Sequence, residues 1–335
     1  MKRIAFFFVA AGTVLFTSCG SNTNNEQKKE VATDTVAAKP LNLPVFDADS
    51  AYDYVSRQVA LGPRTPGSTA QTKCAAWMES QLTKSCDTVY RQSVHVTGGD
   101  GKSLPCFNII GVINPKAAKR ILFLTHWDSR AWADQDTKNT DKPILAADDA
   151  GSGVGVLLEV ARQIKAHGLP ANIGIDILLT DVEDYGQTAW GENSYCLGTQ
   201  YWAMHPHIPG YKAEFGVLLD MVGARGAQFP LEGFSAQFAG DVQQKIWKAA
   251  ADAGYSSFFP FSVNVSITDD HVPVNKIAGI KTVDIINLTN DPEKPFAPHW
   301  HTHADVMDII DKSTLKAVGQ TLLQTIYQEA ERPNA

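Results

Sequence analysis

The sequence predicts a three-layer α/β fold, with a mixed, mostly parallel central sheet that carries helices on both faces. Two observations support this prediction. Apolar runs of buried-strand length alternate along the chain with helical stretches, which is typical of parallel strands joined by helices. From residue 44 onward the composition is that of an ordinary globular domain, without a second linker or an internal repeat. We therefore expect one domain over residues 44–335.

The chain begins with a predicted targeting segment, residues 1–19. Two basic residues precede an apolar stretch too short to span a bilayer, and small residues precede Cys19. The ending LFTSC resembles a bacterial lipobox, so we expect a lipoprotein signal peptide whose cleavage leaves Cys19 as the lipidated N-terminus. A plain secretory signal with an incidental cysteine is the alternative. Residues 20–43 are polar and aperiodic, and are expected to form a flexible tether.

Charge and cysteine usage narrow the class of partner. The net charge of −7 and the lack of a basic stripe argue against nucleic-acid binding. The cysteines after Cys19 are scattered, with no CxxC pair, so a zinc–thiolate site is not expected; which of them would pair in an oxidising compartment stays open. A lipid anchor would place the protein in the bacterial cell envelope, with the periplasmic side favoured. We expect a monomer.

The first elements after the tether are two helices and a hairpin. Helical spacing predicts helices over residues 47–59 and 68–84, and Ser68 is placed to cap the second. Alternating stretches over residues 88–96 and 105–113 predict two strands, and the glycine-rich run between them predicts a hairpin turn.

Buried strands and helices then alternate. The predicted strands are ILFLT (121–125), IGIDILLT (173–180), FGVLLD (215–220) and VDIINL (283–288). The predicted helices cover residues 152–168, 240–254 and 313–331. In sheets of this kind ligands bind outside the carboxyl ends of the strands, so the functional residues are expected there.

Acidic and histidine residues collect at those strand ends. Any one such motif could be a helix cap or a solvated loop, but several at the end of one sheet favour a functional site. Carboxylates and imidazoles without thiols favour a catalytic zinc ion with three protein ligands and one open position. The residues are His126, Asp128, Asp148, Asp149, Asp181, Glu183, Asp184, Asp220, Asp269, Asp270, His271, His299, His301, His303 and Asp305.

The order of the motifs resembles that of the M28-type zinc peptidase superfamily. The motifs are LGPRTPGS, HWDS, DDAGSG, VED, LLDMVG, DDH and WHT, and they cover the chain from about residue 50. Within that superfamily the chain looks most like the animal-type zinc-dependent glutaminyl cyclases (glutaminyl-peptide cyclotransferases), in a bacterial lipoprotein form. The resemblance implies a zinc aminopeptidase-like catalytic domain. It also implies conversion of the N-terminal glutamine of peptides or proteins to pyroglutamate, with release of ammonia.

The resemblance also implies roles for individual residues. The zinc ligands would be Asp149, Asp184 and His301, where Asp184 is a departure because the cyclases commonly have glutamate there. Glu183 matches the general base. Two further acids, Asp220 and Asp269, match those in a hydrogen-bond network with the base.

Three aromatic residues match the walls of the substrate pocket in the cyclases. They are Phe296, Trp300 and Trp190, although the local spacing around Trp190 does not align with the family pattern. Ordinary core packing is the alternative reading for Trp300.

Two enzyme classes stay open at this point. An M28-type zinc aminopeptidase uses two metals to activate water, and would recruit His126 and Asp220 to the second ion. A cyclase needs one zinc, and His126 would then stand behind the ligands with Asp128 orienting its imidazole. The tryptophan before His301 and the doubled acid at Asp269 favour the cyclase. A non-catalytic binding lipoprotein is a third class, disfavoured because the expected ligands and base are all present.

Overall fold

The computed structural model describes residues 42–332. The targeting segment, Cys19 and nearly all of the tether lie outside these residues, so those predictions stay predictions. Among the helices that the structure describes, none combines the length and apolarity needed to cross a membrane. The four cysteines of this part of the chain are buried and free.

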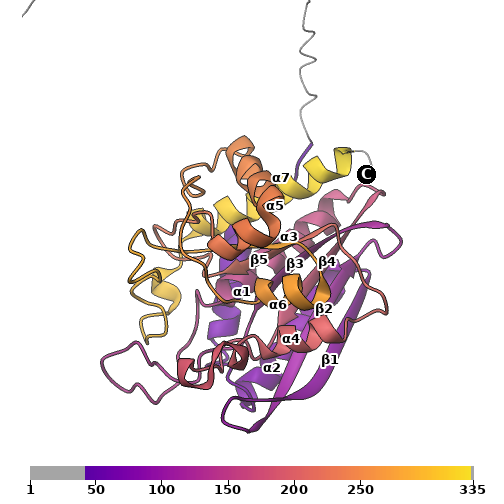
Figure 1. Cartoon of the computed structure of the whole chain (residues 1–335). Coiled ribbons are helices and arrows are strands. Elements are labelled where there is room, and N and C mark those ends of the chain that lie inside the picture. The colour runs from indigo at the N-terminus through magenta and orange to yellow at the C-terminus, as the bar shows by residue number, and fades with distance from the viewer. Residues whose placement is uncertain (1–41, 333–335) are drawn as a thin grey trace, which may run out of the picture. The chain divides into compact units, whose positions relative to one another are not determined.

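Six strands form one mixed sheet in the order β1-β2-β4-β3-β5-β6 (Figure 1). The strands β3, β4, β5 and β6 run parallel, whereas β1 and β2 form an antiparallel hairpin whose second strand pairs antiparallel with β4. The predicted mixed, mostly parallel sheet is confirmed. The bounds are β1 Thr88–Thr97, β2 Ser103–Ile113, β3 Lys119–His126, β4 Ile173–Thr180, β5 Phe215–Asp220 and β6 Thr282–Ile286.

Helices cover both faces of the sheet. Alternate residues of β3 belong to two different apolar clusters: Ile121 and Phe123 pack with the large helices, whereas Leu122 and Leu124 pack with α4 and the segment after α6. Every residue of β3, β4 and β5 is buried, as expected for strands covered on both sides. The helices are α1 Ala48–Val59, α2 Thr69–Ser85, α3 Gly151–His167, α4 Leu197–Met204, α5 Gly233–Asp252, α6 His271–Pro273 and α7 Lys312–Glu331.

Polar side chains fix where the helices begin. Ser68 accepts a hydrogen bond from the backbone N–H of Gln71 at 2.9 Å, which confirms the predicted cap of α2. Asp47 and Asp311 cap α1 and α7 in the same way. The helix predicted over residues 240–254 corresponds to the second part of α5, which follows a kink at Ala239. The part before the kink begins at Gly233, where the buried carboxylate of Glu232 accepts hydrogen bonds from two N–H groups of the first turn.

Glycines let α3 lie close to its neighbours. A side chain on Gly153 would clash with Thr125 of β3, and a Cβ on Gly155 would lie 2.6 Å from Cγ2 of Val55 in α1. The helix is therefore held between the sheet and α1, and its first turn lies at the carboxyl edge of the sheet. Asp149 stands just before that turn.

Candidate active site

The predicted site residues meet at the carboxyl edge of the parallel strands. His126 is the last residue of β3, Asp220 is the last residue of β5, and Glu183 and Asp184 follow β4. Parallel strands present their carboxyl ends on one side, which is why residues nearly 100 positions apart converge. Asp149 and His301 reach the same place from the loops before α3 and after β6.

Asp149, Asp184 and His301 form a group that can hold a metal ion. Each offers one ligand atom, and these atoms all lie within 4.8 Å of one another. The Nε2 atom of His301 lies 3.6 Å from Oδ2 of Asp149 and 3.2 Å from Oδ1 of Asp184. The Oδ2 atoms of both aspartates are buried and have no hydrogen-bond partner. Because unpaired buried carboxylate oxygens are costly, these atoms suit a cation held by three protein ligands.

Two residues that the sequence analysis missed support these ligands. Oδ1 of Asp134 lies 3.2 Å from Nδ1 of His301, on the side of the ring away from the metal group. Arg130 contacts Asp134 at 2.7 Å and Asp184 at 3.1 Å, and so ties both acids to one guanidinium. A carboxylate behind a ligand histidine fixes the orientation of the ring and raises its basicity. Burial opposes protonation of His301, but Asp184 and Asp134 together raise its pKa to about 9.

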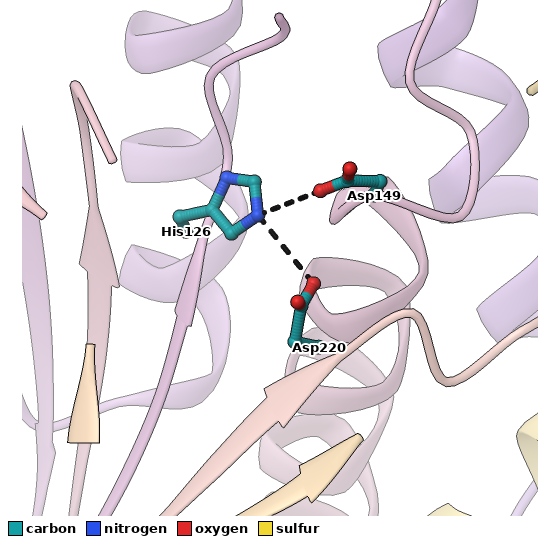
Figure 2. Close-up of side chains that lie close together, drawn as sticks. All are labelled: His126, Asp149 and Asp220. Atoms are coloured by element: carbon teal, nitrogen blue, oxygen red, sulfur yellow. Dashed lines mark hydrogen bonds and ion pairs between the residues drawn. The ribbon is translucent and has the colours of Figure 1, made fainter. Parts of the chain in front are cut away.

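His126 lies between two acids, as Figure 2 shows. Its Nε2 atom is 3.0 Å from Oδ1 of Asp149 and 3.5 Å from Oδ1 of Asp220. These three residues form a second group with the donor types and spacing that a metal ion requires. The geometry is therefore compatible with one metal ion or with two.

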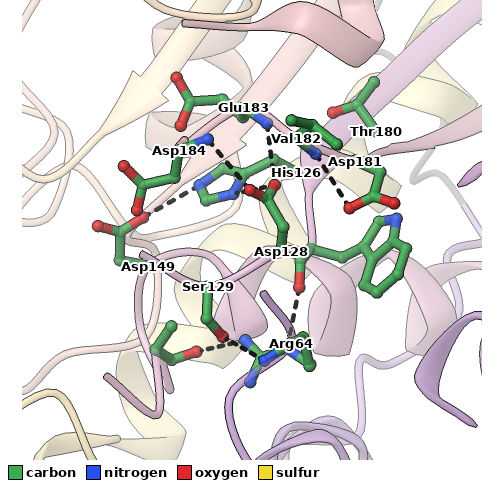
Figure 3. Close-up of polar contacts among 12 residues, drawn as sticks. Arg64, His126, Asp128, Ser129, Asp149, Thr180, Asp181, Val182, Glu183 and Asp184 are labelled. Carbon is green, nitrogen blue, oxygen red and sulfur yellow. Dashed lines mark hydrogen bonds and ion pairs between the residues drawn. The ribbon is translucent and has the colours of Figure 1, made fainter. Parts of the chain in front are cut away.

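Asp128 holds the backbone that carries the base and one ligand (Figure 3). Its two carboxylate oxygens accept hydrogen bonds from the N–H groups of Glu183 and Asp184, at 3.0 and 3.1 Å. Oδ1 of Asp128 also lies 3.5 Å from Nδ1 of His126, so the acid can orient the imidazole, as the sequence analysis expects in a one-zinc enzyme.

Glu183 lies in a cluster of buried acids. Burial raises its pKa well above the ordinary value, the neighbouring His126 opposes this shift, and the charges of Asp184 and Asp269 add to it. The thiol of Cys196, which the sequence analysis did not single out, donates to Oε1 of Glu183 at 3.4 Å. The environment therefore favours a Glu183 that holds a proton more readily than an exposed glutamate does.

The pKa values of Asp220 and Asp269, the two acids expected to share protons with the base, are also raised. Burial, followed by the charge of Asp149, raises the pKa of Asp220 to about 7. Burial, followed by the charge of Asp220, raises the pKa of Asp269 well above its ordinary value. Asp220 can therefore exchange protons near neutral pH, as a proton shuttle requires, and Asp269 holds a proton more readily than an exposed aspartate does.

A cavity of about 70 Å³ opens onto this group. It is lined by both aspartate ligands, Glu183, Asp220, Asp269 and His301, and by a wall of Tyr195, Ile267, Thr268, Ile286, Phe296 and Trp300. The rings of Phe296 and Trp300 stack at 4.2 Å between centroids, and Trp300 stacks on the ring of His301 at 3.7 Å.

Trp190 does not line this cavity. It packs against Trp132 and Tyr185 in a separate apolar cluster, next to the hairpin turn between β1 and β2. The residue whose spacing did not align with the cyclase pattern is thus the one that the structure places apart from the other two aromatics.

Four non-glycine residues with positive φ lie in the segments that build the site. They are Val182, Cys196, Met221 and His301, with φ between 50° and 57°. This conformation is a clear outlier for a β-branched residue such as Val182, and such residues persist where the surroundings over-determine them. Val182 and Met221 follow the ends of β4 and β5, so the backbone turns sharply where the functional side chains are presented.

Further buried charged residues lie next to Asp269, on the side away from the cavity: Asp284, His271 and Glu232. Asp284 on β6 is buried, and burial, followed by the charges of Asp269 and Asp220, raises its pKa well above the ordinary value. His271 lies 3.8 Å from Asp284 and 3.2 Å from Glu232. Neither Asp284 nor Glu232 could be predicted from the sequence, because each is an isolated acid in an apolar or loop segment.

Fold and site together define an α/β protein with a zinc exopeptidase-like fold and a group of residues that could hold a metal ion. The chain belongs to peptidase family M28, whose family model matches residues 108–326. Among solved structures, a Bacteroides thetaiotaomicron glutaminyl cyclase bound to N-acetylhistamine is 48% identical, with a TM-score of 0.82 over 85% of this chain and 99% of that chain. A Zn-dependent exopeptidase from Parabacteroides distasonis is 46% identical, with a TM-score of 0.82 over 85% and 99%.

A curated relative gives the same family at lower identity. The glutaminyl-peptide cyclotransferase of Boiga dendrophila is 26% identical in an alignment 243 residues long, which covers 64% of this chain and 63% of the relative. The chain thus spans less than two thirds of that relative's length. These comparisons confirm the resemblance to M28 proteins and to glutaminyl cyclases that the motifs predicted.

Proposed function

We propose that this protein is a glutaminyl-peptide cyclotransferase that uses one zinc ion. The observation that carries the proposal is the small cavity in which three metal-ligand side chains, a buried glutamate and a wall of stacked aromatic rings meet. A pocket of this size suits one amino-acid side chain at the end of a peptide. The likeness to a solved glutaminyl cyclase over nearly its whole length supports the same substrate, the N-terminal glutamine.

Zinc, held by Asp149, Asp184 and His301, would supply a Lewis acid that polarises the side-chain amide carbonyl of the substrate. The aromatic wall would hold the glutamine folded back, so that its α-amine lies near its own amide carbon. Because the reaction is intramolecular, this positioning supplies much of the acceleration. The bond between the α-nitrogen and the amide carbon forms, the bond to the amide nitrogen breaks, and ammonia leaves.

Glu183 would move the proton. It takes one from the α-ammonium group of the substrate and delivers one to the departing amide nitrogen. Its raised pKa suits this task, because a less acidic carboxyl takes up a proton more readily than an exposed glutamate does. Asp220 and Asp269 lie beside it in the cavity wall and would share the proton.

An M28-type aminopeptidase with two metals is the alternative. It is favoured by one observation, the group of His126, Asp149 and Asp220, which could hold a second ion. Hydrolysis would need that second ion to activate water, whereas cyclisation uses the substrate's own amine as the nucleophile. The two functions therefore differ in metal count as well as in product.

We also propose that the mature protein is anchored by lipid at Cys19, in the bacterial cell envelope and on the periplasmic side. A tether of the length of residues 20–43 would let the enzyme reach N-termini of exported proteins near the membrane. The test is fractionation of cells that express the wild type or Cys19→Ser. The wild type is expected in the membrane fraction and the variant in the soluble fraction, and equal distribution would overturn the anchor.

The activity is tested with two peptides, one that begins with glutamine and one that begins with leucine. Purified zinc-loaded protein is incubated with each, and the products are followed by mass spectrometry. We expect loss of ammonia from the glutamine peptide and no change in the leucine peptide. Release of the first residue from the leucine peptide would overturn the proposal in favour of an aminopeptidase.

A further inference from the structure

A second cavity adjoins the catalytic one. Its volume is about 240 Å³, compared with about 70 Å³ for the catalytic cavity. The two cavities share Tyr195 and Thr268 in their walls. The larger cavity therefore begins where the catalytic cavity ends, and the mechanism above gives it no role.

The small volume of the catalytic cavity limits what it can hold. Its lining consists of the metal ligands, the acids and the aromatic wall, which suit the terminal glutamine of the proposed substrate. A peptide substrate continues beyond that glutamine through its carbonyl group, so its second residue must lie outside. The shared wall at Tyr195 and Thr268 is where the larger cavity can receive it.

We infer that the larger cavity binds the side chain of the second residue of the substrate, and that it prefers an apolar one. This inference rests on the proposed function. One wall is apolar and consists of Val272, Pro273 and Ile277. Ile277 is 46% exposed, one of the few large apolar side chains of the described residues that are open to solvent. An apolar substrate side chain would bury this surface, and burial of apolar surface is favourable.

The segment that carries Ile277 is held in place before any substrate binds. It is a short π-helical turn, Val274–Ala278, and Gly279 ends it with a φ of 68°. The side chain of Asn275 donates to the carbonyls of His271 and Thr282, at 2.8 and 2.7 Å, and accepts from the N–H of Thr282 at 3.0 Å. A fixed wall gives more selectivity than a mobile one, because little ordering is needed on binding.

The charged groups of this cavity stand at its solvent side. Glu192 and Lys276 both line it and both are exposed. The ammonium of Lys276 lies 5.8 Å from the ring centroids of Phe234 and Phe238, and within residues 42–332 it forms no ion pair. With one charge of each sign at the rim, neither acidic nor basic second residues gain a net preference, which leaves apolar contact as the discriminating interaction.

The test compares two peptides that differ only at the second position, Gln-Leu-Ala and Gln-Gly-Ala. We measure kcat/KM for ammonia release with the zinc-loaded wild type. An apolar pocket that accepts leucine is expected to favour Gln-Leu-Ala by roughly tenfold, mainly through a lower KM. A ratio near one would overturn the inference while leaving the proposed function intact. Ammonia from neither peptide would overturn both.

Variants test whether Ile277 causes the preference for leucine at the second position of the substrate. Ile277→Asp is expected to bring the leucine-to-glycine ratio close to one, and the milder Ile277→Ala should lower it part of the way. Ile208→Asp is the matched control, because Ile208 is 37% exposed and lines neither cavity. The control should keep the wild-type ratio. An unchanged ratio in both Ile277 variants, with their thermal unfolding as in the wild type, would contradict the assignment.

Discussion

Oδ1 of Asp134 lies 3.2 Å from Nδ1 of His301, on the side of the imidazole that faces away from Asp149 and Asp184. This contact leaves Nε2 as the ring atom directed at the proposed metal. Burial raises the pKa of Asp134, but the contacts with His301 and Arg130 lower it more, to well below its ordinary value. The carboxylate therefore stays ionised. An acid that no sequence motif marks thus sets the orientation of a proposed zinc ligand.

Asp134→Asn should weaken zinc binding by about 10- to 100-fold, because the ligand histidine loses the partner that orients it. Competition with a chromogenic chelator measures this directly. Asp136→Asn is the control, since Asp136 makes a similar contact with His303, at 2.9 Å, outside the cavity. Equal zinc affinity of Asp134→Asn and the wild type would contradict the assignment.

Glu183→Gln should lower the rate of ammonia release by about 10²- to 10⁴-fold, since the amide cannot shuttle a proton. Zinc should stay bound, because Glu183 is not one of the three proposed ligands; inductively coupled plasma mass spectrometry would verify this. Glu214→Gln, at an exposed position away from the site, should keep full activity. A Glu183→Gln variant that remains active would show that another group is the base.

Trp300→Ala should raise KM for a glutamine peptide roughly tenfold, because it removes the ring that stacks on Phe296 and His301. Trp190→Ala should leave KM near the wild-type value, since Trp190 packs in another cluster. Steady-state kinetics of both variants, with their zinc content measured alongside, makes the comparison. The reverse order of effects would place the pocket next to Trp190.

The folded protein should lose stability in acid through Glu232. Burial raises the pKa of this residue, but contacts with His271 and Ser235 lower it more, to about 2 from an ordinary 4.5. A lowered folded-state pKa means that the stabilisation is complete above pH 4.5 and is lost as the pH falls toward 2. The difference corresponds to about 3 kcal/mol in the free energy of unfolding.

Denaturant unfolding between pH 6 and pH 2 tests this account of Glu232. Glu232→Gln should be less stable than the wild type at pH 6, and its stability should fall less steeply below pH 4.5. Glu293→Gln, at an exposed loop position, should follow the wild-type curve. Parallel curves for Glu232→Gln and the wild type would mean that Glu232 does not carry the acid dependence.

Much of the fold could be predicted because its signals are local. The apolar runs at residues 173–180 and 215–220 coincide with β4 and β5, since a buried parallel strand has to be apolar throughout. The part of α5 before the kink at Ala239 could not be predicted, because its first turn begins with a glycine and depends on a buried cap, Glu232. The short helix α4 lies in a segment too brief for a periodic pattern.

The residues of the site likewise fall into those that the sequence predicts and those that it does not. Residues at strand ends, such as His126 and Asp220, could be found because parallel topology brings such positions together. Asp134, Cys196 and Asp284 could not be found, since they reach the site from loop or strand positions only through the folded chain. The family pattern predicts Trp190 as a pocket wall although its local spacing does not conform to that pattern, and in the structure Trp190 lies in another cluster.

The central claim is a cyclase with one zinc ion, and a metal titration tests it most directly. Metal-free protein is titrated with zinc while ammonia release from a glutamine peptide is measured at each step. We predict that activity rises in proportion to zinc and reaches its maximum at one equivalent per chain. Activity that appears only as a second equivalent binds, together with release of leucine from a leucine peptide, would contradict the claim and assign His126 and Asp220 to a second metal ion.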